Sequence, residues 1–369
     1  MTEQSDHQIF DNLFVLELAN NHWGSLERGL KIIEDFGKVV RDNDVYAAIK
    51  LQLRDVDTFI HDSFFGYDKI RYIKKTAATR LNIEEVKIMI EEISKQGCIP
   101  MATPFDEKSV VFCGKLDLPI IKVASSDIAS WSLLKQIAKL NKPVIISTGG
   151  SSNKMIDDCV NFFAKQNIPL AINHCVSLYP SEDRDLELHQ IDYLKKRYPN
   201  NTIGFSSHEK TDWRNSMLIS YAKGARTWER HIDIEFDNVP VSPYCSLPNQ
   251  IDEWFKAFHK GEEMCGNDGS RRRNIPEKEI RYLDELLRGL YAKRDLPEGY
   301  QVSPETINED FYLAIPLHKG QLSCREDIDN LKIKKQLLAN EQVTLDHVDE
   351  KFTDFNEIKT IIEDRGLSN

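Results

Sequence analysis

Short apolar runs recur along the first two thirds of the chain. Eight of them begin at residues 13, 46, 98, 118, 143, 168, 202 and 225. Each run is rich in Val, Ile or Leu and lacks strict polar alternation, which is typical of a strand buried on both faces. Between and after the runs, apolar residues at three- and four-residue spacing predict helices over 26–40, 81–97, 126–141, 152–167, 211–224 and 248–264.

This succession of eight β-then-α units predicts an α/β protein with a (β/α)8 TIM barrel. An open, doubly wound sheet is the alternative, because a sequence does not show whether a sheet closes. No G-x-G-x-x-G pattern follows the first run, which weakens the dinucleotide-binding version of the open sheet. The interval 52–80 is long and predicts an insertion with a loop and an extra helix.

Polar side chains stand at the end of every predicted strand. Active sites of (β/α)8 barrels lie at the carboxyl ends of the strands, so we expect these side chains to converge on one mouth. In chain order they are Glu17, Lys50, Gln52, Thr103, Lys122, Ser125, Asp127, Ser147, Asn173, His174, Ser177, Tyr179, Ser206, Ser207, His208, Glu229, Arg230 and His231. One polar strand end is ordinary, whereas polar residues at the same end of all eight strands indicate a functional site.

The residue types at these strand ends narrow the chemistry. Lys50 and Lys122, with hydroxyl groups near tight Gly turns, suit a ligand that carries a phosphate and a carboxylate. His208 and His231 lie on neighbouring predicted strands, and with Glu17 opposite they predict a divalent-metal site with open positions. The plainer alternatives are that each histidine is structural and that Lys50 pairs with a carboxylate on a neighbouring strand.

Composition argues against several classes of protein. A net charge of −11 over 369 residues argues against a nucleic-acid partner, which needs a basic face. The polar N-terminus shows no signal peptide, and no apolar run approaches the ~20 residues that span a bilayer. Seven cysteines without a C-x-x-C pair are typical of reduced thiols. We therefore expect a cytoplasmic protein that binds neither nucleic acid nor membrane.

The alternation of strands and helices stops after the last predicted helix. The predicted parts of the chain are a barrel over 1–265, a polar linker over 266–284, a small domain over 285–350 and a C-terminal tail over 351–369. In the small domain, LPEGYQVSPETI (296–307) and LLANEQVTLDHV (337–348) align without gaps, which indicates a pseudo-symmetric, β-rich fold. Chance similarity is the alternative. So small a domain is marginally stable alone, so we expect it to pack against a barrel.

Together, the strand-end motifs resemble those of the sialic acid (N-acetylneuraminate) synthases. The resemblance covers nearly the whole chain and is carried by ELANNHWGS, IKLQ, ATPFD, IKVASSDI, PVIISTGG, HCVSLYPS, IGFSSHE, GARTWERHI and, near the C-terminus, LYAKRDLPEGYQVSPETI. It implies a phosphoenolpyruvate-condensing barrel followed by a small antifreeze-like (SAF) domain. It also implies a domain-swapped homodimer in which each SAF domain covers the partner's barrel mouth.

The resemblance also implies roles for the strand-end residues. The metal, most often Mn²⁺ with Mg²⁺ or Co²⁺ as alternatives, would bind His208 and His231. Glu17, Gln52 and Tyr179 would face the sugar, and Glu17 and Asp127 would be the catalytic carboxylates. Phosphoenolpyruvate would bind Lys50, Thr103, Lys122, Ser125, Ser147, Ser177 and Ser206. C3 of phosphoenolpyruvate would attack a sugar aldehyde, water would add at C2, and phosphate would leave with C–O cleavage to give a 3-deoxy-2-keto acid.

The chain departs from the family pattern at several positions. Asp127 stands where the family usually has Glu, and Ser177 stands where it has Asn. Ser242 lies near a position that is often Asp, and YLAIPLHKG (312–320) replaces an Arg-Pro-Gly motif whose Arg reaches the N-acyl sugar. Most of these departures fall on the sugar side. We therefore expect an acceptor aldehyde related to N-acetylmannosamine, such as a modified hexosamine, rather than N-acetylmannosamine itself.

Other functions remain open at this point. A related synthase could take a non-N-acetylated or shorter aldehyde. A Schiff-base aldolase could use Lys122, and a metal hydrolase could use the histidines. A sugar-binding protein that has lost catalysis is the non-enzymatic alternative. Phosphate release that depends on both metal and aldehyde separates the condensing enzyme from the rest.

Overall fold

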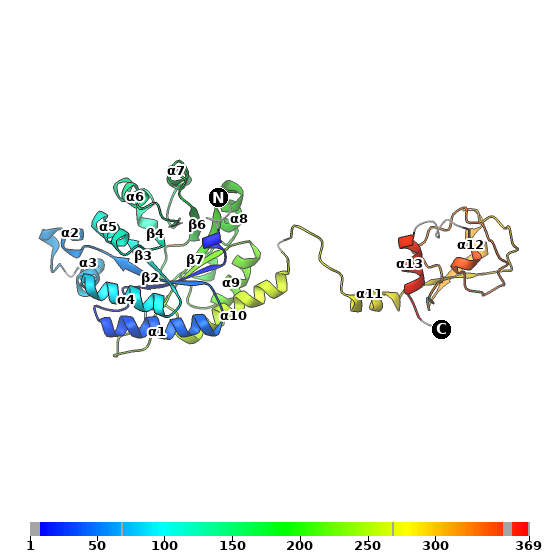
Figure 1. Cartoon of the computed structure of the whole chain (residues 1–369), viewed down its shortest axis with the longest axis horizontal. Coiled ribbons are helices and arrows are strands. Elements are labelled where there is room, and N and C mark those ends of the chain that lie inside the picture. Colours follow the sequence, from blue (N-terminus) through cyan, green and yellow to red (C-terminus); the bar gives the residue numbers. More distant parts are fainter. Residues whose placement is uncertain (1–7, 68, 268, 350–355, 368–369) are drawn as a thin grey trace. The chain divides into compact units, whose positions relative to one another are not determined.

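The computed structural model describes residues 8–67, 69–267, 269–349 and 356–367. The chain forms two compact units, Met1–Gly266 and Asn267–Asn369, and each is described by itself (Figure 1). In the described part of the chain, no helix is long and apolar enough to cross a membrane.

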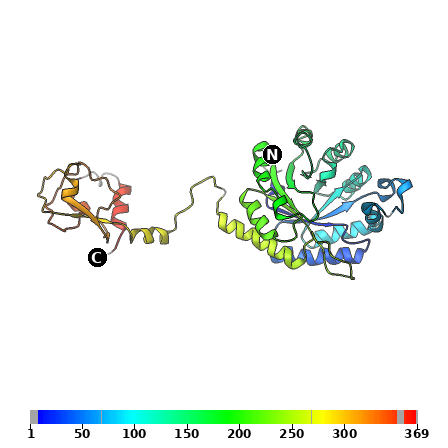
Figure 2. The ribbon, with the colours of Figure 1, turned by 180° about the vertical axis from the view of Figure 1, so that it is seen from behind.

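The first unit is a closed barrel of eight parallel strands, which confirms the predicted (β/α)8 fold and excludes the open sheet (Figure 2). Hydrogen bonds join β1 to β8 as well as to β2, so the sheet has no free edge. The strands are β1 (Leu13–Ala19), β2 (Ala47–Leu53), β3 (Ile99–Pro104), β4 (Ile120–Val123), β5 (Val144–Ser147), β6 (Leu170–Cys175), β7 (Thr202–Ser207) and β8 (Thr227–His231).

Helices surround this barrel. They include α1 (Leu26–Asp42), α4 (Ile83–Lys95), α5 (Glu107–Lys115), α6 (Trp131–Ala138), α7 (Asn153–Ala164), α8 (His189–Arg197), α9 (Trp213–Ala222) and α10 (Pro248–Cys265). The sequence had not indicated α5 and α8, which are short. The predicted start at 126 of the helix over 126–141 was wrong, because Ser125–Asp127 form a separate 3-10 turn before α6.

The helix ends follow local sequence signals. Asn82 begins α4 with a capping box, in which its side chain accepts from the Glu85 backbone N–H and the Glu85 carboxylate accepts from the Asn82 backbone N–H. Gly97 follows the helix with φ +81°, a conformation that favours glycine. α4 buries Val86, Met89, Ile90 and Ile93 against the outer face of the barrel.

The barrel lumen contains an apolar layer near the amino ends of its strands. Leu13, Val15, Ala48, Met101, Ile120, Ile145 and Ala171 form one buried cluster with Phe10, which precedes β1. Because side chains alternate along a strand, the residues two positions further on point into the same lumen, nearer its mouth. On β1, β2, β4 and β5 those residues are Glu17, Lys50, Lys122 and Ser147.

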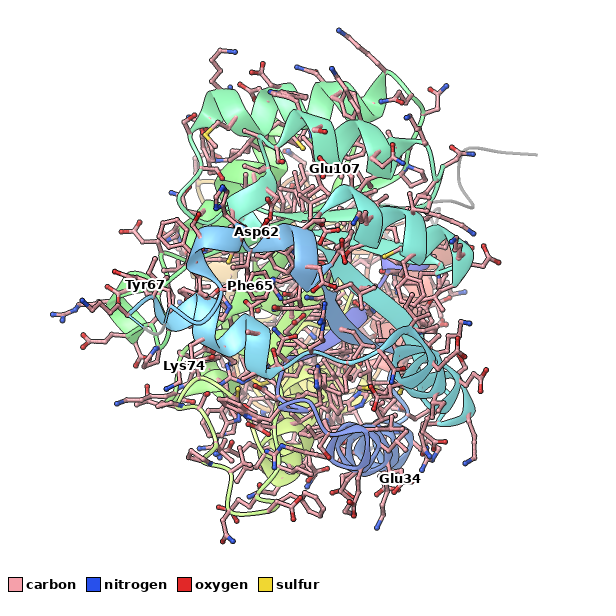
Figure 3. All side chains as sticks on the ribbon, turned by 90° about the vertical axis from the view of Figure 1, so that its left-hand side faces the viewer. Glu34, Asp62, Phe65, Tyr67, Lys74 and Glu107 are labelled. Atoms are coloured by element: carbon pink, nitrogen blue, oxygen red, sulfur yellow. The ribbon has the colours of Figure 1, made fainter. Side chains whose placement is uncertain are left out.

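The predicted insertion after β2 is present. It holds α2 (Val56–Phe59), a 3-10 turn (Asp62–Phe64) and α3 (Arg71–Ala78). Figure 3 views the barrel unit from this side, with Asp62, Phe65, Tyr67 and Lys74 marking the segment. The insertion therefore covers the side of the unit where β2 ends.

The second unit is a small β-rich domain, as predicted. Its regular elements are α11 (Glu277–Asp284), β9 (Gly289–Ala292), α12 (Ile307–Asp310), β10 (Phe311–Ala314), a 3-10 turn (Leu345–His347) and α13 (Asn356–Asp364). α11 lies inside the segment predicted as a linker. α13 lies inside the segment predicted as a tail, yet Ile362 belongs to the domain core. Residues 350–355, 368 and 369 of the predicted small domain and tail lie outside the described residues.

Backbone hydrogen bonds in the second unit follow the predicted repeat. Leu296 and Leu337, which are equivalent in the alignment, exchange both hydrogen bonds with each other, at 2.8 and 2.9 Å. The offset between them, 337 − 296 = 41, also relates other bonds. The Val302 N–H donates to Leu331 O, and the equivalent Val343 N–H donates to Leu290 O. This pairing supports pseudo-two-fold symmetry over chance similarity.

Candidate active site

The polar layer of the lumen centres on Lys50. The Lys50 ammonium donates to the Thr103 hydroxyl at 3.0 Å, forms an ion pair with Glu17, and lies 3.6 Å from Glu229 Oε1. All four side chains are buried. Burial and the nearby Lys122 charge lower the pKa of Lys50 to about 8, despite the opposing attraction of Glu229. Lys50 is therefore mostly charged at neutral pH and can lose its proton at mildly alkaline pH.

Lys122 is the second cation of the lumen. Its ammonium donates to the Ser147 hydroxyl at 2.7 Å and to the Val123 carbonyl at 2.8 Å. Its nitrogen lies 4.0 Å from Glu229 Oε2. Glu229 thus lies between the two lysines. Burial tends to raise the pKa of Glu229, but Lys50, Lys122 and His208 outweigh it, so the pKa lies below its usual value.

Hydroxyls and a glycine turn lie above the lysines. The Gly149 backbone N–H donates to Ser125 Oγ at 3.1 Å. A Cβ at Gly149 would collide with the hydroxyls of Ser125 and Ser177, so this approach requires glycine. Ser206 is buried on β7, in register with Glu229 on β8. Ser125, Ser147, Ser177 and Ser206 therefore come from four successive strand ends around the two lysines.

His208 and His231 lie side by side, with ring centroids 5.4 Å apart. His208 Nδ1 lies 2.9 Å from the Val176 carbonyl, which makes it the protonated nitrogen and leaves Nε2 with a free lone pair. His231 Nδ1 is buried without a hydrogen-bond partner. Burial lowers the pKa of His208 to about 4, and burial with the neighbouring His208 lowers that of His231 well below its usual value. Both rings are therefore neutral, as metal ligation requires.

The predicted third metal ligand, Glu17, does not join this pair. Its two oxygens contact Gln52 Nε2, at 3.0 Å, and Lys50. Across the described ranges, no group of three or more His, Cys, Asp or Glu side chains has the spacing of a metal site. Two neutral imidazoles, one with a buried unpartnered nitrogen, fit an ion that takes its other ligands from water or substrate.

Three further predicted residues lie at the mouth. Tyr179 is half exposed, and its ring centroid lies 4.1 Å from that of His208. Gln52 links Glu17 to Arg54, since both Arg54 terminal nitrogens donate to Gln52 Oε1 at 3.0 Å. Asp127 ends the 3-10 turn after β4 and accepts from Ser126 Oγ at 2.8 Å. Burial raises the pKa of Asp127, against the effects of Ser126, Arg54 and Lys122.

Comparison with known proteins identifies the family of this chain. The model of the NeuB family matches residues 45–269. The chain belongs to the NeuB family. The crystal structure of a putative spore coat polysaccharide biosynthesis protein E from Chromobacterium violaceum is 32% identical in sequence, with a TM-score of 0.86 over 92% of this chain and 99% of that one.

Named synthases are also similar to this NeuB family chain. The N-acetylneuraminic acid synthetase of Leptospira borgpetersenii is 25% identical, with a TM-score of 0.64 over 74% of this chain and 91% of that one. The pseudaminic acid synthase of Campylobacter jejuni is 27% identical over 82% of this chain and 87% of its own. These matches confirm the predicted family and enzyme class, the phosphoenolpyruvate-dependent synthases of sugar acids.

The expectation that all strand-end residues converge on one mouth was wrong for several of them. The Arg230 guanidinium, one residue from Glu229 and His231, donates to Ser246 Oγ, Ser207 Oγ and the Glu209 carbonyl, away from the lumen. His174 Nε2 pairs with the Leu186 carbonyl at 2.7 Å, which supports its reading as a core residue. The reason is alternation: neighbouring strand residues point to opposite faces of the sheet.

Sequence reasoning assigned no role to three residues that this NeuB family site contains. Glu229 was noted as a strand end, and its two-residue spacing from His231 could have placed it in the lumen. Arg54, the residue after β2, follows Lys50 and Gln52 at the same two-residue spacing. Tyr244 lies outside the barrel strands, with its ring centroid 5.1 Å from that of His231, and no periodic signal marks it.

Proposed function

We propose that the chain catalyses a metal-dependent aldol-type condensation of phosphoenolpyruvate with a sugar aldehyde. The product would be a sialic-acid-like 3-deoxy-2-keto acid, with release of phosphate. The observation that carries this proposal is the pair of buried ammonium groups, Lys50 and Lys122, which face hydroxyls beside two neutral imidazoles. Family membership supports the same class of reaction.

The lysines and hydroxyls suit an enol phosphate. Lys122 with Ser147, and the Gly149 N–H with Ser125, present donors from neighbouring strands, as phosphate oxygens require. Lys50 with Thr103 lies across the lumen and would take the carboxylate. Ser177 and Ser206 complete the proposed set. The Lys50 and Lys122 ammonium groups and the Gly149 N–H already have partners in the free chain, so the ligand would replace these internal contacts.

The charges of the lumen explain why a metal would be needed. Lys50 and Lys122 are balanced by Glu17 and Glu229, and the imidazoles are neutral. Phosphoenolpyruvate would therefore bring negative charge that these residues do not offset. A divalent cation on His208 and His231 would offset it and, when bound, would polarise the aldehyde carbonyl as a Lewis acid. We propose Mn²⁺, with Mg²⁺ or Co²⁺ as alternatives.

The residues of the chain position the other groups. Tyr179 and Gln52 would hold the sugar with its aldehyde carbon facing C3 of phosphoenolpyruvate. One C–C bond forms there, the aldehyde oxygen gains a proton, and water adds at C2. Phosphate then leaves with the bridging oxygen. Glu17 and Asp127 are the carboxylates placed to move these protons, and the raised pKa of Asp127 suits that task.

The acceptor we propose is an N-acetylmannosamine-like or modified hexosamine. The chain departs from the family pattern on the acceptor side, at Asp127, Ser242 and the 312–320 segment, which supports a modified sugar. A non-N-acetylated or shorter aldehyde is the alternative.

We further propose that the second unit is an SAF domain that covers the mouth of a partner subunit in a domain-swapped homodimer. The cytoplasmic location stays a prediction.

A phosphate-release assay tests the proposal. The chain, phosphoenolpyruvate and Mn²⁺ are incubated with a panel of hexosamine-derived aldehydes, and phosphate is measured with and without each component. We expect phosphate only when metal and aldehyde are both present. Phosphoenolpyruvate labelled with ¹⁸O at the bridging position should deliver the label to phosphate. Pyruvate turnover without phosphate would instead indicate a Schiff-base aldolase, and sugar binding without turnover would indicate a binding protein.

A further inference from the structure

Arg54 lies where the lumen meets the insertion, and it takes no part in the reaction proposed above. It is the residue after β2, two positions beyond Gln52 and four beyond Lys50, so all three point to the same side of the strand. A cavity of about 770 Å³ is lined by Gln52, Arg54 and residues of the insertion such as Thr76. Arg80 lines the same cavity, where it forms an ion pair with Asp57.

The Arg54 guanidinium is held rigidly on both sides. Its central carbon lies 3.7 Å from the centroid of the Phe105 ring and 5.5 Å from that of Phe59. Its two terminal nitrogens share one acceptor, Gln52 Oε1, at 3.0 Å each. Because the guanidinium is planar and stacks on an aromatic ring, its two N–H donors set both the direction and the distance of their shared acceptor.

This contact fixes the direction of the Gln52 amide. A guanidinium only donates hydrogen bonds, so Gln52 must turn its carbonyl oxygen toward Arg54 and its NH₂ group away. That NH₂ group donates to Glu17 Oε1 at 3.0 Å, and the other Glu17 oxygen pairs with Lys50. A continuous chain of polar contacts therefore runs from Arg54 at the rim to Lys50 in the lumen.

Arg54 also acts on Asp127. Asp127 and Asp106 are the two carboxylates whose charges stabilise the Arg54 cation, and Arg54 and Lys122 are the two cations that stabilise ionised Asp127. Arg54 and Asp127 are nonetheless too far apart for a direct ion pair, since no nitrogen–oxygen distance between these two described residues is within 4.0 Å. The influence is electrostatic, across the mouth of the site.

We infer that Arg54 is a positioning residue, which holds the Gln52 amide toward Glu17. The inference rests on the proposed function, because Gln52 takes its role from it. The fork of donors on Arg54 carries this role, and the charge of the guanidinium has a separate electrostatic effect on Asp127.

Two variants separate these effects. Arg54→Met removes the fork and the charge. It should raise KM for the acceptor about tenfold or more, with KM for phosphoenolpyruvate changed less than about threefold. It should also move the limb of the pH–rate profile that belongs to Asp127 upward by about 0.5 to 1 pH unit, because the carboxylate loses a nearby cation. Arg54→Lys keeps the charge, so it should return the Asp127 limb to its wild-type pH. It should leave the KM for the acceptor raised, because the fork of donors is lost.

Arg80→Met is the matched control, since Arg80 lines the same cavity without contacting Gln52. It should leave the KM for the acceptor within about twofold of wild type and the pH profile within about 0.2 pH unit. Equal effects of Arg54→Met and Arg80→Met, or full restoration of KM by Arg54→Lys, would overturn the inference.

A crystal structure of Arg54→Met provides a readout that does not depend on turnover. We expect Gln52 Nε2 to have moved out of hydrogen-bonding distance of Glu17 Oε1. Retention of that contact near 3.0 Å would overturn the positioning role whether or not the wild type is active. If wild-type chain releases no phosphate with any acceptor, the proposed function fails, and this structure still decides the role of Arg54.

Discussion

The protonation of Lys50 gives a quantitative prediction about phosphoenolpyruvate. The pKa of Lys50 is about 8 instead of 10.5, because burial disfavours its charged form. The difference, 10.5 − 8, means that the barrel interior disfavours the charged form of Lys50 by about 3 kcal/mol relative to water, at 1.36 kcal/mol per pKa unit. Lys50 is buried, so solvent screening reduces this figure little. Below pH 8 the ammonium attracts the anion, and above pH 8 the neutral amine does not.

The assay is the pH dependence of kcat/KM for phosphoenolpyruvate, which reports ionisations of the free enzyme. We expect a nearly constant value below about pH 7 and a fall that approaches about tenfold per pH unit above about pH 9. Lys50→Arg should remove this fall, because a guanidinium stays charged throughout the range. Calorimetric binding of phosphoenolpyruvate to the wild type should be about fivefold weaker at pH 9 than at pH 8, which checks the same claim without turnover.

Lys108→Arg is the matched control. Lys108 is an exposed lysine on α5 that pairs with Asp55, and its replacement should leave the profile unchanged. A wild-type kcat/KM that stays constant to pH 9.5 would refute the assignment of Lys50 as a phosphoenolpyruvate ligand with a depressed pKa. A fall that persists unchanged in Lys50→Arg would place the titrating group elsewhere.

Three other predictions address the catalytic carboxylate, the metal and the barrel itself. Asp127→Asn should lower kcat by about 10² or more if Asp127 moves protons, whereas a fall below about tenfold would reduce it to a positioning group. His231→Ala should abolish turnover and Mn²⁺ dependence while the circular dichroism spectrum and Tm stay close to wild type; retained activity would remove the metal assignment. Gly204→Ala should lower the free energy of unfolding by about 2 kcal/mol or more, because the new Cβ would collide with Thr227 Oγ1 and Asn173 Oδ1 inside the barrel. Gly114→Ala, which meets only the movable end of Leu140, should cost less, and equal losses in denaturant unfolding would contradict the packing argument.

The barrel could be predicted from the sequence because buried parallel strands leave a clear signal. Most strands carry an apolar run with a polar residue near the carboxyl end, and the count of eight limited the possible topologies. Helices α5 and α8 bury only two or three side chains each, so their apolar periodicity is weak. α13 could not be assigned to the domain core, because its burial depends on partners that are distant in sequence, such as the backbone around Leu317 and Gly320.

The part of the site that follows from strand order and from alternation along each strand could be predicted. Lys50, Lys122, His208 and His231 share one mouth because each lies at the carboxyl end of its strand. Arg230 was placed there wrongly, because neighbouring strand residues face opposite sides of the sheet. Arg54 lay beyond sequence reasoning for another reason. Its position depends on the Phe105 ring and on the direction of one amide, and neither is encoded in spacing.

The central claim is that one mouth of the barrel holds a metal ion on two imidazoles next to an enol phosphate on two lysines. A crystal structure of the full chain with Mn²⁺ and phosphoenolpyruvate tests it most directly. We expect the anomalous manganese peak within bonding distance of a His208 and a His231 nitrogen, with the phosphate contacting Lys122 and Ser147. A manganese peak away from both imidazoles, or phosphoenolpyruvate bound outside the lumen, would contradict the account.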